Sequence, residues 1–521
     1  MKAVGGREFI TNQTIMQIHQ LFRSGKLNPI DLYTICQERV VKTKSLNSFI
    51  TITDKIGLEQ AKSSWNRYKK GQPLGLLDGI PISIKDNFNT RSIETTCASK
   101  MLRDYISPYN ATLTEKLFKA GACLIGKTNM DEFAMGSACS ESYFGPTFHP
   151  WNSDLDLAYF SKTEMSSILQ SEPNTNQNDW FIPGGSSGGS AVSVSVGSAF
   201  ASLSSDTGGS TRNPASRVGI VGFKPSYGVL SRFGLIPLTN SLDAPSIMTK
   251  NIDDTVVFFS SLHGSDVNDS TSISLKVSDK IKPMELRDLI IGVPEEYDSP
   301  DLCPSTRKAW KEAQQILMTN GVTIKYISLP HTKYSLPCYL ILNCCDVASN
   351  FACYDGIEYG NSSEKNEITF EDFYSATREE SLNDIVKSRI ITGNYFLLKS
   401  NYRRFYEKSL KIRRLICDDF EKVFKKIDFI LTPVCISPTI NYSKWTLKDK
   451  TEEAIKDDYC TQPSNMAGLP ALSLPFKLDA DNHNLPIGMQ IIGKKFDDFR
   501  LLQFGKRFEN LIQFPHLVFP D

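Results

Sequence analysis

The sequence predicts an α/β protein, and three pairs of segments carry that prediction. In each pair, a segment with the apolar spacing of a helix leads directly into a short apolar segment of strand length. The pairs are 111–119 with 122–125, 306–320 with 322–328, and 403–426 with 428–431. Helices that alternate with short buried strands are typical of layered α/β folds.

The segments before these pairs fit the same class. Residues 12–45 are expected to form two helices, because apolar side chains recur at helical spacing from Ile15 and a second helix start follows at Pro29. Residues 77–84 alternate like a strand that ends at Lys85-Asp86. The N-terminal third is therefore expected to supply both helices and sheet.

Composition excludes several classes of protein. The 521 residues include 58 Lys and Arg against 58 Asp and Glu, so the formal net charge is zero. A protein that mainly grips phosphate backbones needs excess positive charge. No stretch approaches the ~18–20 consecutive apolar residues that span a bilayer. An ordinary 40% of hydrophobic residues fits a globular chain of one large domain or up to about three smaller ones.

Cysteine and histidine usage predicts no metal site. The 12 cysteines are scattered without a CxxC motif, and the six histidines form no zinc-like spacing with them. Free, buried thiols in a reducing compartment are expected. His149 is expected to be structural. Residues 1–23 lack the apolar core of a secretory signal, and targeting is not readable from them.

Three stretches differ from ordinary α/β sequence. Residues 152–179 are polar and irregular, which predicts an exposed, protease-sensitive insert. Residues 184–210 are rich in Gly and Ser, but the apolar residues threaded through them favour a tightly packed core segment over a flexible linker. The basic run 399–414 is interpreted as a solvated helix face, balanced by nearby acidic residues, rather than as an RNA-binding stripe.

One nucleotide-binding motif is present by its letters. Residues 121–128 match GxxxxGK[ST], which binds phosphate only as a loop between a strand and a helix. Here the middle residues, Ala-Cys-Leu-Ile, are expected to be the strand itself. We therefore interpret the match as chance, and keep a P-loop nucleotide-binding module as an alternative function that tight Mg-ATP binding would support.

A stronger pattern combines glycine-flanked serines with a lysine. Ser186 lies in Gly-Gly-Ser-Ser-Gly-Gly-Ser, and Ser210 follows Asp-Thr-Gly-Gly. Such glycines let backbone approach a substrate and let successive N–H groups point at one oxyanion. A serine nucleophile needs a base, and no histidine lies in a triad-like context. Lys85 ends an apolar strand, where burial would lower its pKa toward that of a base.

Taken together, these segments resemble the amidase signature family. The resemblance rests on 79–86, 184–190, 206–212 and 222–228, and it extends over nearly the whole chain. It implies one large domain over 1–521, with a mixed β-sheet between layers of α-helices and a polar loop inserted at about 153–180.

The resemblance also implies roles for single residues. Lys85 would be the base, Ser186 a bridging serine beside a cis peptide bond, and Ser210 the nucleophile. The N–H groups of the segment that includes Thr207, Gly208, Gly209 and Ser210 would form the oxyanion hole. Arg389 and Asp458 would bind the two charged ends of the substrate backbone.

Within the family, segments 126–137, 144–147, 354–356 and 463–470 resemble the glutaminases of tRNA-dependent amidotransferases. This implies that glutamine is hydrolysed and that ammonia passes to a B-type partner subunit. That partner would bind ATP and Mg and convert Glu-tRNA(Gln) to Gln-tRNA(Gln), and a small third subunit is a further expected partner. No cofactor is expected in this chain. A stand-alone amidase for another small or lipid amide is the alternative.

The sequence departs from the family pattern at three places. The link between Trp151 and Pro183 is longer than in bacterial relatives, Ser388 replaces a common Arg, and 246–248 replaces a usual Gly-Pro. None of these differences removes an expected catalytic residue. The resemblance implies a mitochondrial location, or a cytoplasmic one for a bacterial source, and the polar insert favours a fungal mitochondrial version.

Overall fold

A computed structural model describes residues 10–151, 180–275, 284–364, 369–446 and 456–518. The predicted insert at about 153–180 lies outside these residues except for Trp180, which is buried.

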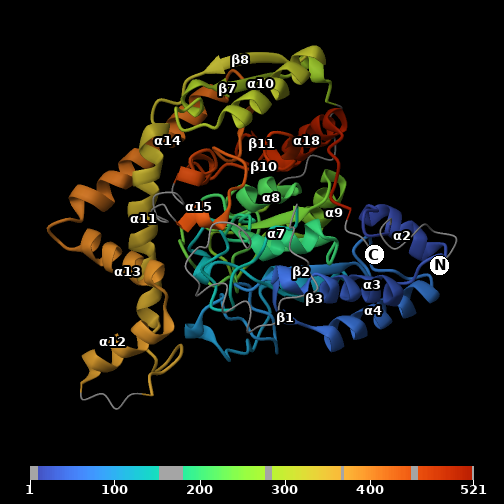
Figure 1. Cartoon of the computed structure of the whole chain (residues 1–521), viewed down its shortest axis with the longest axis horizontal. Helices are drawn as coiled ribbons and strands as arrows, with labels where there is room; N and C mark the ends of the chain where they lie inside the picture. Colours follow the sequence, from blue (N-terminus) through green and yellow to red (C-terminus); the bar gives the residue numbers. More distant parts are fainter. Residues whose placement is uncertain (1–9, 152–179, 276–283, 365–368, 447–455, 519–521) are drawn as a thin grey trace.

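A single mixed sheet organises the described part of the chain (Figure 1). Its strand order is β1-β3-β2-β4-β6-β5-β10-β11-β9-β7-β8. The strands are β1 Phe49–Ile52, β2 Pro81–Lys85, β3 Cys123–Thr128, β4 Ala201–Asp206, β5 Val221–Lys224, β6 Ala244–Thr249, β7 Ile290–Pro294, β8 Thr323–Ile327, β9 Phe429–Pro433, β10 Ala471–Asp479 and β11 Leu485–Ile492. β2 pairs in parallel with β3 and β4, and β7 with β8 and β9, whereas the strands between these groups pair antiparallel.

Helices cover both faces of this sheet. On one face, α7 (Gly188–Ser195) packs against β2, β3, β4 and β6, and α8 (Arg212–Val218) packs against β5, β10 and β11. On the other face, α9 (Ile252–Leu262) and α18 (Asp498–Ile512) pack together over the centre of the sheet. The predicted mixed sheet between helix layers is confirmed. Lys85 belongs to the α7 side, because Ser83, two residues earlier on β2, contacts Ser193 of α7 at 3.0 Å.

The remaining helices lie at the two ends of the sheet. Those at the β1–β3 end or near it are α2 Ile15–Arg23, α3 Pro29–Lys42, α4 Asp54–Lys69 and α5 Thr112–Lys119. Near β8 lies α10 Pro304–Thr319. Short helices are α15 Tyr442–Thr446 and α17 Gln462–Met466, and 3-10 turns occur at Lys44–Leu46, Lys100–Leu102, Glu132–Ala134, Leu286–Asp288, Glu295–Tyr297, Thr332–Tyr334 and Phe351–Cys353.

A helical excursion connects β8 to β9 and projects from the body of the molecule (Figure 1). It contains α11 Ser335–Asn350, α12 Phe370–Ser381, α13 Asp384–Leu397, the π-helical turn η8 Arg403–Glu407 and α14 Lys408–Val423. α11 packs along α13 and α14. Within the described residues, one stretch, Thr332–Cys353, is long and apolar enough to span a membrane by length and composition, yet half of its most apolar window is buried in the protein.

Most predicted elements are confirmed, with two corrections of their bounds. β2 begins at Pro81 rather than at residue 77, because Gly79 adopts a φ of 84° and the preceding residues form a turn. β3 extends beyond residue 125 to Thr128. The Gly/Ser-rich segment is the wholly buried helix α7 followed by β4, so the linker alternative is wrong.

The basic run is a largely solvated face with one exception. Lys411 pairs with Glu407 and Arg414 with Asp418, as expected for a balanced helix surface. Arg413, however, points inward and donates to the carbonyl oxygen of Met466 at 2.8 Å.

The structural role expected of His149 is confirmed, and the cysteines are free as expected, although not all of them are buried. His149 is buried against the carbonyl oxygen of Arg217 at 2.9 Å, and burial lowers its pKa to about 4. All 12 cysteines are free, and nine are buried.

Candidate active site

Lys85 lies at the end of β2, where every residue of the strand is buried. Its Nζ donates to Ser186 Oγ at 2.8 Å and to Ser205 Oγ at 3.0 Å. Burial away from water disfavours the ammonium and lowers the pKa of Lys85 to about 8. A lysine in this setting is neutral in an appreciable fraction of molecules near neutral pH and can accept a proton.

Ser186 is held by the backbone around it. The Gly185–Ser186 peptide bond is cis, as the family resemblance implies. The carbonyl oxygen of Ser186 accepts from the N–H of Asp131 at 3.2 Å. Ser187 N–H donates to the carbonyl oxygen of Ser210 at 3.2 Å, which ties the segment of Ser186 to that of Ser210. The structure thus brings the three predicted catalytic residues into one buried region at the carboxyl ends of β2 and β4.

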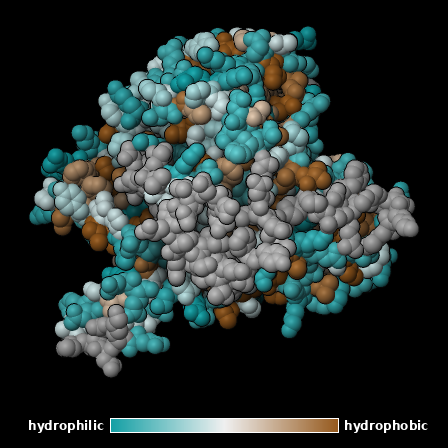
Figure 2. All heavy atoms as spheres, in the orientation of Figure 1, coloured by the Kyte–Doolittle hydropathy of each residue, from teal (hydrophilic) through white to brown (hydrophobic). Residues whose placement is uncertain are grey.

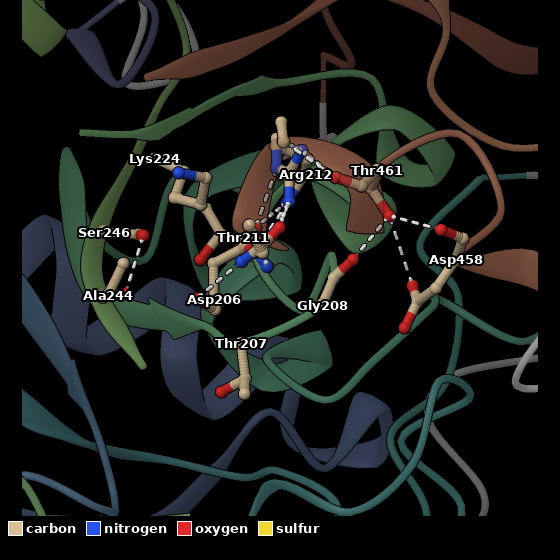
Figure 3. A network of polar contacts seen from close by, with 12 residues as sticks. Asp206, Thr207, Gly208, Thr211, Arg212, Lys224, Ala244, Ser246, Asp458 and Thr461 are labelled. Carbon is tan, nitrogen blue, oxygen red and sulfur yellow. Dashed lines mark hydrogen bonds and ion pairs between the residues drawn. The ribbon is translucent and has the colours of Figure 1, made fainter. Parts of the chain in front are cut away.

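The loop that carries Ser210 is fixed by a buried ion pair. Asp206, at the end of β4, pairs with Arg212 at 2.8 Å, and both side chains are fully buried. This pairing holds the pKa of Asp206 down to about 2 despite its burial. Arg212 also donates to the carbonyl oxygen of Thr461 at 2.9 Å (Figure 3). The loop from 207 to 211 is therefore anchored at both ends.

The glycines of this loop lie directly against the segment of Asp458. A Cβ added to Gly209 would come within 2.4 Å of both Asp458 Oδ1 and Thr461 Oγ1. Thr461 Oγ1 donates to the carbonyl oxygen of Gly208 at 2.7 Å, so that carbonyl points toward Thr461 (Figure 3). Glycine at 209 is thus required by the close approach, whatever the role of its N–H.

The two predicted substrate-binding residues lie near each other. Tyr339 of α11 is buried beside Gly208, and the charges of both Arg389 and Asp458 act on its pKa. Burial together with the neighbouring Asp457 and Asp206 raises the pKa of Asp458 to about 8, while Arg389 opposes that shift. Arg389 lies on α13 and donates from Nη1 to Asn343 at 2.7 Å. Arg389 suits a carboxylate, and Asp458 suits an ammonium group that favours its ionised form.

The P-loop alternative fails on geometry. Gly126, Lys127 and Thr128 are part of β3 and cannot form a phosphate-binding loop. Lys127 is fully buried, and its ammonium forms an ion pair with Asp86 at 2.9 Å, so it is not directed at a phosphate. The interpretation of this motif as a chance match is confirmed.

Sequence reasoning missed several polar residues around the site. Ser205 accepts from Lys85 and also from Asn87 Nδ2 at 3.0 Å. Asp243 accepts from Thr207 Oγ1 at 2.6 Å, and Asn343 contacts Arg389. Ser205 and Asn87 border recognised motifs and could have been found by that proximity. Asp243 and Asn343 belong to distant segments, and no spacing in the sequence points to them.

Fold and site together define the class of protein. The family model described as Amidase matches residues 32–158 and 155–502, and the chain belongs to the amidase signature family.

The particular relatives are more specific than the family. The A subunit of the mitochondrial glutamyl-tRNA(Gln) amidotransferase of Ixodes scapularis is 45% identical over 511 residues, which cover 97% of this chain and 96% of the relative. Its human counterpart is 45% identical over 508 residues, with 96% and 94% covered.

Solved structures agree with this placement. The crystal structure of the A subunit of glutamyl-tRNA(Gln) amidotransferase from Thermotoga maritima superposes with a TM-score of 0.74 at 31% identity, covering 98% of each chain. A 6-aminohexanoate cyclic dimer hydrolase has the same fold, with a TM-score of 0.76 over 96% of this chain and 97% of its own, at 18% identity.

Proposed function

We propose that this chain is the glutaminase subunit of a tRNA-dependent amidotransferase, which converts Glu-tRNA(Gln) to Gln-tRNA(Gln) with ammonia taken from glutamine. The observation that carries the proposal is that a buried Lys85–Ser186 pair and the Ser210 loop lie together with the guanidinium of Arg389 and the titratable carboxyl group of Asp458. The 45% identity to the A subunits of mitochondrial amidotransferases, over nearly the full length of the chain, supports it.

The reaction begins with Ser210. Its Oγ attacks the side-chain amide carbon of glutamine, while its proton passes through the hydroxyl of Ser186 to neutral Lys85. The negative charge that forms on the amide oxygen is accepted by N–H groups of the loop from Thr207 to Ser210. The C–N bond then breaks, and the nitrogen takes the proton back from Lys85 through Ser186, so that ammonia leaves.

Water completes the cycle. A water molecule gives its proton to the Ser186–Lys85 pair and attacks the acyl-enzyme ester. The ester bond breaks, Ser210 regains its proton, and glutamate is released. Throughout, Arg389 binds the α-carboxylate and Asp458 binds the α-ammonium of the substrate.

The proposal includes partners. Ammonia passes to a B-type subunit, which binds ATP and Mg and the tRNA, and a small third subunit is a further partner. A net charge of zero suits a chain that leaves RNA binding to another subunit. Hydrophobic residues reach the surface of the projecting excursion (Figure 2). Ile391, Tyr395 and Leu398, on and next to α13, are exposed apolar side chains that suit contact with another subunit. The names of the relatives support a mitochondrial location.

The decisive experiment is an assay of glutamine hydrolysis by the chain together with its B-type partner, with and without Glu-tRNA. Release of glutamate and formation of Gln-tRNA(Gln) are expected. In a Ser210→Ala complex, both should stop with glutamine, but ammonium chloride should restore Gln-tRNA(Gln). Turnover of other amides without any glutaminase activity would instead support a stand-alone amidase.

A further inference from the structure

One face of α11 lies behind the proposed substrate site. Tyr339 and Asn343 are four residues apart and therefore lie on the same side of the helix. Tyr339 borders Gly208, whereas Asn343 is fully buried one turn further on. The Asn343 side chain uses both ends of its amide: Oδ1 accepts from Arg389 Nη1 at 2.7 Å, and Nδ2 donates to Thr239 Oγ1 at 2.6 Å.

The contact to Thr239 continues toward the Ser210 loop. Asp243 Oδ2 accepts from the N–H groups of Leu238 and Thr239, each at 2.9 Å. Its other oxygen accepts from Thr207 Oγ1 at 2.6 Å. A continuous path of short contacts therefore runs Arg389–Asn343–Thr239–Asp243–Thr207. Every member except Arg389 is buried, and Arg389 is partly buried.

Helix packing fixes the start of this path. Gly393, one turn beyond Arg389, lets the backbone of α13 approach α11 so closely that an added Cβ would lie 1.9 Å from the carbonyl oxygen of Cys344. Arg389 Nε is buried and has no hydrogen-bond partner within the described residues. Asn343 is the described residue to which Arg389 donates, so the guanidinium is held at Nη1 while Nη2 has no hydrogen-bond partner among the described residues.

We propose that Asn343 is a positioning residue that aims Arg389 at the substrate carboxylate, and that Asp243 holds Asn343 from behind through Thr239 while fixing Thr207 in front. This inference rests on the proposed function. An uncharged amide suits the position, because it accepts from Arg389 without cancelling the charge that attracts the carboxylate. A carboxylate there would pair with Arg389 and compete with the ligand.

The test compares two substrates in the complex with the B-type partner. Glutamine carries the α-carboxylate, and 4-aminobutanamide is the same amide without it. In Asn343→Ala, KM for glutamine should rise roughly 10- to 100-fold, the effect of losing one hydrogen bond to a charged group. In the shape-conserving Asn343→Asp, KM for glutamine should rise as well, because the new carboxylate keeps the contact with Arg389 but competes with the substrate carboxylate for it. The kcat/KM for 4-aminobutanamide should change less than about threefold.

Two further variants separate positioning from a merely structural role. In Arg389→Ala, adding Asn343→Ala should have no further effect on glutamine, because the group that Asn343 aims is already gone. Asp243→Asn should lower kcat for both substrates, because Asp243 fixes Thr207, and should in addition raise KM for glutamine alone, because Asp243 also supports Asn343 through Thr239.

The contrary results are distinct. Equal losses on both substrates in Asn343→Asp, or no loss on either, would overturn the positioning role. If Arg389→Ala itself fails to discriminate the two substrates, or if the wild-type complex does not hydrolyse glutamine, the proposed function fails instead.

Discussion

Lys85 illustrates how much single residues reveal at the level of sequence. Its place at the end of an apolar strand predicts burial, and burial predicts a lowered pKa; the structure has both. Its partner Ser186 could be proposed from glycine-rich context and family resemblance. Asn343 could not, because a buried asparagine in an apolar helix has no local signature, and its meaning comes from a helix that packs across it.

The pKa of Lys85 predicts the pH dependence of the reaction. The base must be neutral, and a pKa of about 8 means that the neutral fraction increases as pH rises through that value. The kcat/KM for glutamine should therefore increase between about pH 6.5 and 8.5 and then level off. Lys85→Arg should lose about 10³-fold or more, because guanidinium does not deprotonate in this range.

The Lys85→Arg variant separates the loss of the base from the loss of a positive charge. Lys85→Arg keeps the positive charge, so near-normal turnover in it would exclude lysine as the base. Ammonium-dependent formation of Gln-tRNA(Gln) by the same complex would show that the chain is still folded.

The raised pKa of Asp458 predicts that a proton is released when glutamine binds. Its pKa is raised to about 8 in the empty site, so most molecules hold it protonated at pH 7. The α-ammonium of glutamine favours the ionised carboxylate and lowers this pKa, so binding should expel up to one proton at pH 7 and fewer at pH 9. Calorimetry of a Ser210→Ala complex in buffers of different ionisation enthalpy measures this number, and Asp458→Asn should abolish it.

At the scale of elements, the packing of α13 against α11 sets the position of Arg389, for which we propose a role in binding the substrate carboxylate. The sequence predicts helices around sheet strands by their periodicity, and those elements are confirmed because periodicity reports burial of one face. Periodicity does not reveal which helices pack against each other. The close contact between Gly393 of α13 and Cys344 of α11 joins residues some fifty positions apart. Only the folded chain shows why position 393 is a glycine.

Gly393→Ala tests this close contact, and the sign of its effect is informative. In an ordinary helix, Gly→Ala stabilises by about 0.5–1 kcal/mol. Here the new methyl would lie 1.9 Å from a backbone oxygen, so α13 must shift. We expect destabilisation by about 1–3 kcal/mol and an increased KM for glutamine. Thermal unfolding and steady-state kinetics measure both.

Ile391→Ala is the control on the same helix. Its side chain is 70% exposed and faces away from α11, so the thermal stability of the chain measured without its partner should remain unchanged. Stabilisation by Gly393→Ala would show that the helices tolerate separation and that their spacing does not set the site.

For the whole molecule, the sequence predicted the class of fold but not the order of strands. Alternating helices and strands indicate an α/β sheet, and the family resemblance adds its mixed character. The order places β10 and β11, near the end of the chain, beside β5 and β9. Such pairings join segments up to about 250 residues apart, and no local pattern encodes them. The contact between Arg212 of the buried Asp206–Arg212 pair and Thr461 likewise joins two segments far apart in the sequence.

The balanced charge of the molecule predicts weak binding of RNA by this chain alone. The basic residues Lys411 and Arg414 are paired with acidic neighbours rather than free for phosphates. At physiological salt, the isolated chain should bind tRNA with a Kd weaker than about 10 μM and with a shallow salt dependence. Fluorescence anisotropy with labelled tRNA measures this; a steep salt slope that Lys411→Ala reduces would revive the RNA-binding interpretation of 399–414.

The excursion between β8 and β9 has an evolutionary consequence. The groups proposed to break the amide bond come from β2, β4 and the loops beside them, whereas Tyr339, Asn343 and Arg389 all come from the excursion. Sequence changes in the excursion could therefore alter substrate recognition during evolution, while the residues proposed to break the amide bond stayed the same. Exchanging the excursion between lineages is accordingly a route by which substrate range could drift without reinventing the chemistry.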